Sequence, residues 1–331
     1  MKTFTKLMAG GGLVIVLLAP FCASGQGTIQ TQKVGNVTFT MEGANGWLFG
    51  DVTYQIGGQV VYASGESTSY HFPISELKFP MNNAISRIAT AVAYKRMELS
   101  ASFAHTLTSD AGTMEDSDWS DSDNPTVKTV FSESDSTLDA WIANVGLNYA
   151  FHETRGAFRH KLTGGVGCLY EAFDWENSNF DQSYPSTPGA SHDYYSGVGI
   201  TYKANLLMPY LALSETIGTR RVSASATVRF APWARISDED DHVYRQISSE
   251  TEADGMAVQL AIQGNLNITR AVFVFVRGEY LYCKAEGDSQ NEVYGPGVNN
   301  SSADSVGQKW SIEEEIVSSQ MIVSTGIGIK L

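Results

Sequence analysis

Residues 256–268 decide the fold of this chain, and they read Met-Ala-Val-Gln-Leu-Ala-Ile-Gln-Gly-Asn-Leu-Asn-Ile. Apolar side chains alternate with polar or small ones, which places the two sets on opposite faces of a β-strand. A strand of a soluble sandwich rarely carries so long an apolar row opposite a row of amides. Lipid outside a barrel and a polar lumen inside it account for both rows.

The same alternation recurs along the chain, at residues 141–151, 222–230, 272–282 and 323–331. Long polar connections alternate with short ones; the long ones lie near 64–70, 119–136, 177–193, 241–254 and 287–307. Five long loops imply about ten strands. The sequence therefore predicts an all-β fold, a ten-stranded antiparallel transmembrane β-barrel with long extracellular loops. A soluble β-sandwich or jelly roll is the alternative, and the lengths of the runs and the asymmetry of the loops disfavour it.

The N-terminus has the pattern of a targeting signal. Lys2 and Lys6 precede an apolar run at 13–19, and small residues follow near Ser24. We expect residues 1–25 to be a secretory signal peptide and residues 26–331 to form a single barrel domain. The run is too short for a membrane-spanning helix. A lipoprotein signal at Cys22 is the less favoured alternative.

The net charge limits the classes of binding partner, and the cysteine positions limit the disulfides that the chain could form. The formal net charge is −14, and removal of the two signal lysines would make it −16. Such an acidic protein disfavours nucleic acid and attracts cationic partners, although the same charge also serves solubility. Cys168 and Cys283 lie far apart in the predicted strand order, so we expect free thiols, with one disulfide as the alternative.

Two short motifs carry the chemistry. Asp116 and Asp118 form one pair at positions i and i+2, and Asp240 and His242 form another. On a strand, each pair faces one side. Two strands that aim these pairs into one cavity could activate a water molecule, which indicates a hydrolase. Each motif alone also fits a structural role: the acidic segment as a solvated loop or a calcium site, although it lacks the usual glycine, and the other as a turn cap.

The wider segments resemble a known family. Residues 114–125 read Met-Glu-Asp-Ser-Asp-Trp-Ser-Asp-Ser-Asp-Asn-Pro, and residues 237–242 read Ser-Asp-Glu-Asp-Asp-His. Together they resemble the acidic and Asp-x-His segments of the omptins, outer-membrane endopeptidases of Gram-negative bacteria. Residues 75–79 and 199–213 also match strands of that family. The resemblance implies a barrel that extends above the membrane, with its active site at the extracellular rim.

The resemblance assigns catalytic roles to Asp116, Asp118, Asp240 and His242. We expect a water molecule between His242 and Asp116, with His242 as the base and Asp240 fixing its tautomer. Asp118 should raise the proton affinity of the aspartate pair. Neither a serine nor a cysteine is paired with His242, so no acyl-enzyme is expected, and we predict neither a metal nor a cofactor.

Substrate binding is expected at Asp238, Met114 and Tyr54. Asp238 matches an acidic residue of the family's pocket for a basic side chain, and Tyr54 stands at the position of a second, glutamate, residue. The resemblance thus implies cleavage next to basic residues of cationic peptides or surface proteins. A single carboxylate should discriminate less strictly than two.

The resemblance is weaker where the family binds lipopolysaccharide, the only activator that it suggests. The lipid-binding positions correspond here to Cys168, Tyr170, Ala172 and Asn205, which include no guanidinium group to hold a phosphate. We therefore expect contact with outer-membrane lipid but less dependence of activity on lipopolysaccharide.

Two other functions remain as alternatives. A catalytically inactive barrel could act as an adhesin or surface scaffold, which the loss of any catalytic position would favour. A passive pore would need an open lumen, and Arg229, Arg277 and Glu279 are expected to fill it with ion pairs. We expect a monomeric outer-membrane protease with its active site facing outside.

Overall fold

A computed structural model describes residues 37–154, 156–187, 189–297 and 306–331 of the chain. The predicted signal peptide, residues 1–25, and the first residues of the predicted domain, 26–36, lie outside this part. Where the chain is described, no helix is long and apolar enough to cross a membrane.

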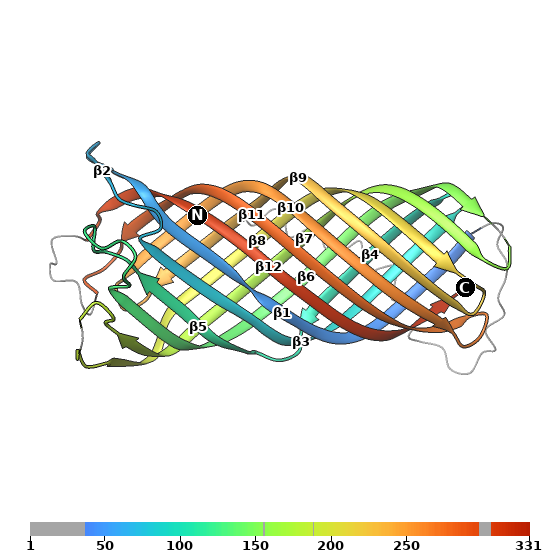
Figure 1. The fold of residues 1–331 in the computed structure, drawn as a ribbon, viewed down its shortest axis with the longest axis horizontal. Helices are drawn as coiled ribbons and strands as arrows, with labels where there is room; N and C mark the ends of the chain where they lie inside the picture. The colour runs from blue at the N-terminus through green and yellow to red at the C-terminus, as the bar shows by residue number, and fades with distance from the viewer. Residues whose placement is uncertain (1–36, 155, 188, 298–305) are drawn as a thin grey trace. The chain divides into compact units, whose positions relative to one another are not determined.

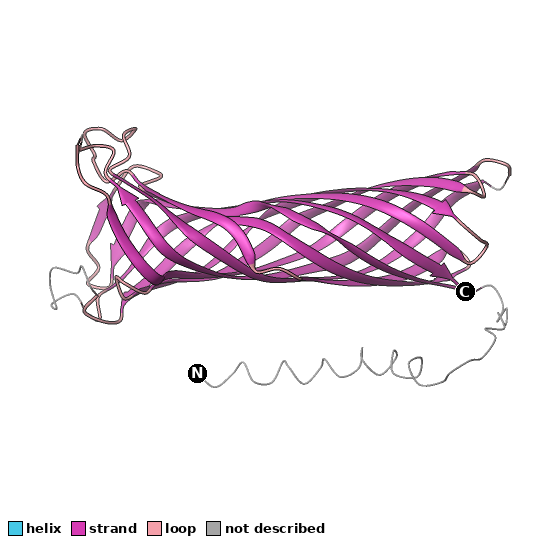
Figure 2. Cartoon of the chain, turned by 90° about the horizontal axis from the view of Figure 1, so that it is seen from below, coloured by secondary structure: helices cyan, strands magenta, loops and turns pink. Residues whose placement is uncertain are grey.

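The described chain consists of strands joined by turns and loops (Figure 2). The strands are β1 (Val37–Tyr62), β2 (Ser67–Ser69), β3 (Ser75–Tyr94), β4 (Met97–Thr106), β5 (Asp110–Asp118), β6 (Val130–Thr154), β7 (Arg159–Ser183), β8 (Asp193–Gly218), β9 (Val222–His242), β10 (Ile247–Asn267), β11 (Val272–Val293) and β12 (Lys309–Lys330).

These strands form one closed antiparallel sheet, whose strands run obliquely along the barrel in Figure 1. β1 pairs with β12 on one side and with β3 on the other, which closes the ring. β4 and β5 follow each other between β3 and β6, so they occupy a single position, and the three-residue β2 only extends the sheet beside β1. The ring therefore has the ten positions that the sequence predicts.

The break between β4 and β5 is held by side-chain hydrogen bonds. Asn83 is fully buried on β3, and its Nδ2 donates to the carbonyl oxygens of Thr108 (2.7 Å) and Asp110 (3.1 Å). These bonds satisfy backbone groups that the interrupted ladder leaves unpaired. β5 can thus continue past the break and carry Asp116 to the end of the sheet.

Most strands are much longer than a membrane crossing requires. β1 has 26 residues and β9 has 21, whereas a tilted strand crosses a bilayer in about 9–11. Because of this extra length, segments that the sequence predicts as long loops belong to strands in the structure. The sequence predicts a loop over residues 241–254, whereas the turn between β9 and β10 contains only residues 243–246. Over residues 248–252 both faces of β10 are polar, so the apolar row that reveals a strand is missing there although the ladder continues.

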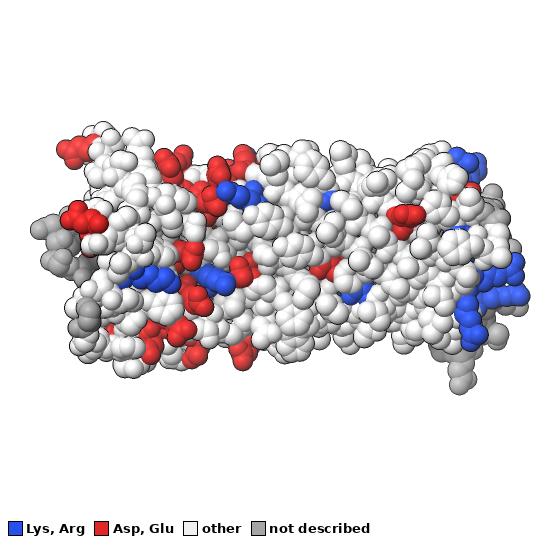
Figure 3. Space-filling model, in the orientation of Figure 1, with Lys and Arg blue, Asp and Glu red and all other residues white. Residues whose placement is uncertain are grey.

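The outer face divides the barrel into two zones. Large apolar side chains are exposed along the strands up to Phe49 on β1, Trp233 on β9 and Met321 on β12, and Val61 near the end of β1 is an exception. Beyond these residues charged side chains take over. On the face seen in Figure 3, acidic residues gather toward the end that carries β2, and the middle is nearly free of charge. The pale zone is the lipid-facing belt, and the acidic zone lies above it.

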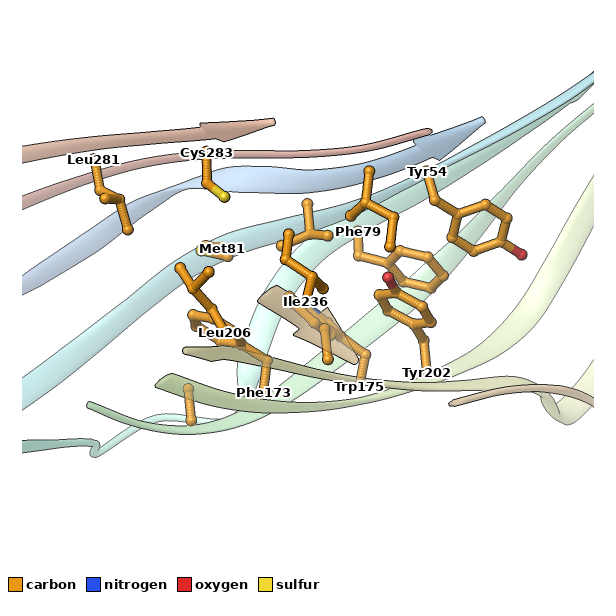
Figure 4. Packing of buried hydrophobic residues seen from close by; sticks show 14 of the residues in the cluster. Tyr54, Phe79, Met81, Phe173, Trp175, Tyr202, Leu206, Ile236, Leu281 and Cys283 are labelled. Carbon is orange, nitrogen blue, oxygen red and sulfur yellow. The ribbon is translucent and has the colours of Figure 1, made fainter. Parts of the chain in front are cut away.

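Aromatic side chains fill the barrel just below the acidic end (Figure 4). Tyr54, Phe79, Trp175 and Tyr202 come from four different strands, and the rings of Phe79 and Tyr202 stack with centroids 4.2 Å apart. This layer of packed aromatic rings closes the lumen below the acidic end of the barrel. Cys283 also faces the interior, and both it and the exposed Cys168 are free thiols, as expected.

Candidate active site

The alternation of β9 places three of the predicted residues on its inner face. Asp238, Asp240 and His242 follow one another at every second position, and all line one cavity of about 110 Å³. Asp241 between them turns away, where its Oδ1 accepts a hydrogen bond from the Tyr294 hydroxyl (2.7 Å). The period of two thus separates the candidate dyad from an adjacent carboxylate that takes no part in it.

Asp240 organises the dyad. Its Oδ2 lies 2.9 Å from His242 Nε2 and also accepts a hydrogen bond from the Tyr54 hydroxyl on β1. A proton on Nε2 makes Nδ1 the nitrogen with the free lone pair. Asp240 is only 4 % exposed, so its charge acts on the imidazole through little solvent. The contact favours the tautomer that carries its proton on Nε2.

The pKa of His242 is raised by this environment. Burial alone would lower it, but the charge of Asp240 and the hydrogen bond to it outweigh burial. Arg245 opposes the shift and Asp116 adds to it. His242 therefore has the basicity of a general base for neutral pH.

The aspartate pair comes from the opposite wall. β5 pairs with β3 so that Asp116 lies opposite Leu77, and Leu77 in turn lies opposite Tyr54 of β1. Asp116 is 7 % exposed, and burial, followed by the charge of Asp118, raises its pKa to about 7. Arg245 and His242 lower that pKa, so both charges lie within electrostatic reach of the Asp116 carboxyl.

Met114 is placed differently from the other predicted substrate-binding residues. It lies two residues before Asp116 on the same face of β5 and is fully buried. Its sulfur accepts a hydrogen bond from the Ser134 hydroxyl (3.5 Å). Asp238 and Tyr54 do line the cavity. Met114 is not among its lining residues, and neither are Asp116 and Asp118 of the same strand, so the expected role of Met114 in substrate binding stays a prediction.

Two residues that the sequence did not single out belong to the cavity. Arg245, in the turn after β9, lies 4.0 Å from Asp118 and also lines the cavity. Glu314, on β12, lines it beside Asp238. Arg245 is close in sequence to His242, and a basic residue in that turn was the available signal. Glu314 gave none, because it lies in an acidic run, residues 313–315, that reads as a solvated strand.

The site has the chemistry of carboxylates and imidazole. Within the described ranges, no three His, Cys, Asp or Glu side chains are grouped as ligands of a metal ion. Asp116 Oδ1 and Asp240 Oδ1 are buried and accept no hydrogen bond from a described protein group. Buried acceptors of this kind require a donor, which a substrate amide or a water molecule can supply.

Comparison with known proteins gives a consistent result. The sequence profile described as the Omptin family matches residues 38–327. Protease 7 of Escherichia coli (strain K12) is 24% identical over 229 residues, which cover 62% of this chain and 68% of that protein. Plasminogen activator of Yersinia pestis is 23% identical over 231 residues, covering 64% and 66%. The crystal structure of the outer membrane protease OmpT from Escherichia coli superimposes with a TM-score of 0.72 and 19% identity, covering 89% of this chain and 97% of that one.

Proposed function

The chain belongs to the Omptin family, and we propose that it is an endopeptidase that cleaves peptide bonds next to basic residues with an activated water molecule. Its barrel lies in the outer membrane of a Gram-negative bacterium. The related proteins are named as proteases, which supports the general activity. One observation carries the proposal: Asp240 anchors His242 on β9, and Asp116 of β5 lies within electrostatic reach of that imidazole.

The mechanism begins with a water molecule held between His242 and Asp116. Asp116 Oδ1 is a buried acceptor without a protein donor, so it can accept one of the water hydrogens. His242 Nδ1 takes the other proton as the water oxygen attacks the peptide carbonyl. The imidazolium that forms is stabilised by Asp240, whose Oδ2 faces Nε2 at 2.9 Å. The proton then passes to the leaving amine, and the peptide bond breaks.

Tyr54 acts through Asp240 in this scheme and is a positioning residue. Its ring is wedged against Phe79 and Tyr202, with centroids 6.0 Å and 5.4 Å away. The fixed ring directs the hydroxyl to Asp240 Oδ2, so the carboxylate cannot rotate away from the imidazole. The family position expected to hold a glutamate thus supports the dyad here.

Basic substrates are favoured by the charge of the site. Asp116, Asp118, Asp238, Asp240 and Glu314 gather at one end of the barrel, and further acidic residues gather on the outer face above the belt on the side seen in Figure 3. A negative cleft in a low-dielectric wall attracts cationic peptides and raises their local concentration. Cationic peptides and surface proteins are therefore the substrate class we propose.

The test is cleavage of a peptide that contains Arg-Arg or Arg-Lys by purified, refolded protein. Asp116→Asn and His242→Ala should each reduce the rate by at least about a thousandfold, since each removes a group that holds or deprotonates the water. Asp241→Asn is the matched control, because its carboxylate points away to Tyr294, and it should cleave normally. All variants should keep the compact electrophoretic migration of a folded barrel. Undiminished cleavage by His242→Ala would refute the mechanism, and an inactive wild type would leave a binding barrel instead.

A further inference from the structure

Two carboxyl groups meet at one side of the candidate active site. Glu314 of β12 and Asp238 of β9 are far apart in sequence, yet both line the cavity that contains Asp240 and His242. Each is 5 % exposed, and their side chains are hydrogen-bonded to each other. Ionised carboxylates only accept hydrogen bonds, so this contact requires one proton. The pair therefore holds a proton between its oxygens.

Neutral groups supply the other hydrogen bonds of the pair. The Tyr202 hydroxyl donates to Asp238 Oδ2 (2.8 Å), and the Thr251 hydroxyl donates to Glu314 Oε2 (2.7 Å). Ser289 also bonds Glu314. Over the part of the chain that is described, neither carboxyl forms an ion pair with a lysine or arginine. The pair is therefore arranged as a receptor for a cation that the protein itself does not provide.

The titratable and charged groups around the pair come from several elements. β1 contributes Tyr54, β8 contributes Tyr202, and β9 contributes Asp240 and His242, while the following turn contributes Arg245. The charge of Asp240 opposes ionisation of both carboxyls. Arg245 lies 4.0 Å from Asp118, on the side of the other aspartate pair. The local field at Asp238 and Glu314 is thus negative.

We propose that Glu314 and Asp238 together bind the guanidinium or ammonium group of the substrate, and that this group displaces the proton they share. The proposal rests on the function proposed above and names the residue that sets its specificity. The family resemblance predicts a single carboxylate, Asp238, in this pocket, because Tyr54 occupies the position of the family's glutamate on the first strand. β12 supplies the second carboxylate from the other side of β1, so the pocket keeps two.

The location of the pair explains how it would select the cleavage point. Asp238 precedes Asp240 on the same face of β9, so the pocket adjoins the dyad. A basic side chain held by the carboxyls would bring its own peptide bond to His242. Two oxygens that accept at once match the paired N–H groups of a guanidinium. A peptide with a neutral side chain at this position should bind more weakly, because a neutral side chain brings no positive charge to take the place of the proton.

Proton displacement gives the pocket a definite pH dependence. Burial, followed by the charge of Asp240, raises the pKa of Glu314 to about 7 against the lowering effect of its hydrogen bonds. Burial, followed by the charge of Glu314, raises the pKa of Asp238 well above its usual range. Below about pH 7 a cation must therefore expel two protons from the pair, whereas above it only the shared proton remains to be displaced. The affinity for a basic side chain should therefore rise as pH increases through about 7, and the affinity for a neutral one should not.

The experiment measures binding, independently of turnover. Full-length refolded Asp116→Asn protein in detergent micelles is titrated calorimetrically with two peptides that differ only in arginine or its neutral analogue citrulline. The arginine peptide should bind at least about tenfold tighter and release close to one proton at about pH 8, measured in buffers of different ionisation enthalpy. Added Glu314→Gln or Asp238→Asn should reduce the preference to about threefold or less. Added Glu315→Gln is the matched control, because Glu315 faces outward to Lys284 (2.9 Å), and it should keep the full preference.

An undiminished preference in a folded Glu314→Gln protein would overturn the proposal, as would equal binding of the two peptides to the parent. If Glu314→Gln does not fold, the proposal is tested on the Asp116→Asn protein alone. Its arginine-to-citrulline preference must increase from about pH 6 to about pH 8, and a constant preference refutes proton displacement. Failure of cleavage by the wild type would defeat the proposed function while this binding result stays readable.

Discussion

Two clusters of buried charged side chains lie inside the same barrel and differ in how their charges are balanced. The lumen cluster, at the level of the lipid belt, consists of Glu42, Arg87, Arg229, Arg277 and Glu279. The rim cluster, above the aromatic layer, consists of Asp116, Asp118, Asp238, Asp240, His242, Arg245 and Glu314. The first has a cation for each carboxylate and the second does not.

The lumen cluster is satisfied throughout. Arg87 bonds Glu279, Arg277 Nη2 lies 3.0 Å from Glu42, and Arg229 Nη1 lies 3.9 Å from Glu279. Gln259, Gln263 and Ser102 accept further guanidinium hydrogen bonds. Such a network places ion pairs across the lumen, as the sequence predicts, beside a cavity of about 270 Å³ that the same residues line. Together with the layer of aromatic rings above it, the network argues against a passive pore.

The rim cluster keeps buried carboxyl oxygens without partners and carboxyls of raised pKa. Both clusters use the same residue types on the same inner face of the strands. The difference lies in the ratio of carboxylates to guanidinium groups. An excess of buried carboxylates stores proton affinity, which a hydrolase can use and a structural network cannot.

The largest expected effect is on stability, in the lumen cluster. Glu279→Gln leaves Arg87 and Arg229 without their shared counter-charge, and we expect a loss of about 3 kcal/mol or more. The measurement is the temperature at which the barrel loses its compact electrophoretic migration. Glu286→Gln, an exposed change on the same strand β11, should have almost no effect. Equal stability of the two variants would remove the contrast between the clusters.

The opposite sign is expected in the rim cluster. Asp116 binds its proton more tightly in the folded state, with a pKa of about 7, than in the unfolded state. Its ionisation therefore destabilises the fold as pH rises from about 4 to about 7, by an amount on the order of a few kcal/mol, and this destabilisation persists at higher pH. Asp116→Asn should raise the melting temperature at about pH 8 while it abolishes cleavage. At about pH 3.5, where Asp116 is protonated in both states, the gain should vanish. A stability loss at alkaline pH would contradict this view of the site.

The pH dependence of turnover follows from His242. Its pKa is raised above 6.5, and protonation removes the base. We expect kcat to fall about tenfold for each pH unit below the apparent pKa and to level off above it. Because kcat reports the enzyme–substrate complex, proton loss from the empty pocket does not enter it. A kcat that is constant between about pH 5 and about pH 8 would exclude His242 as the base.

A smaller effect is expected for Tyr54→Phe. The change removes one hydrogen bond to Asp240 and keeps the packed ring, so kcat should fall by about three- to tenfold. The apparent pKa of the kcat profile should change with it, since the freed Asp240 charge interacts differently with His242. Tyr70→Phe, an exposed loop tyrosine, serves as the control. A fall in KM alone, with no change in kcat or the profile, would argue against a positioning role.

The smallest effect is expected from lipopolysaccharide. At the family's lipid-binding positions, the Tyr170 hydroxyl donates to Asn205 Oδ1 (2.9 Å), and Cys168 and Ala172 offer no phosphate ligand. We propose that reconstitution with and without this lipid changes the rate by no more than about threefold, because guanidinium clamps are missing. Activity only in the presence of lipopolysaccharide would show that other residues hold it.

The sequence by itself determined the strands, the faces and the two motifs. Strand formation and side-chain orientation depend on a local period of two, which residues 256–268 and Asp240–His242 display directly. Even the positions of Asp116 on the third place of the ring and His242 on the seventh follow from counting strands. The same counting failed for the loops above the membrane, where no apolar row marks the strand.

Only the tertiary structure decided which residues share a level around the ring. Closure joins the first strand to the last, so Ile56 of β1 lies opposite Glu314 of β12, and Glu314 thereby reaches Asp238. The stagger between paired strands sets that level, and it arises from the closure of all ten positions together. No short stretch of sequence encodes this level. Only the folded barrel therefore reveals that Glu314 is the second carboxylate of the pocket, that the Tyr54 hydroxyl donates to Asp240, and that Arg245 lies beside Asp118.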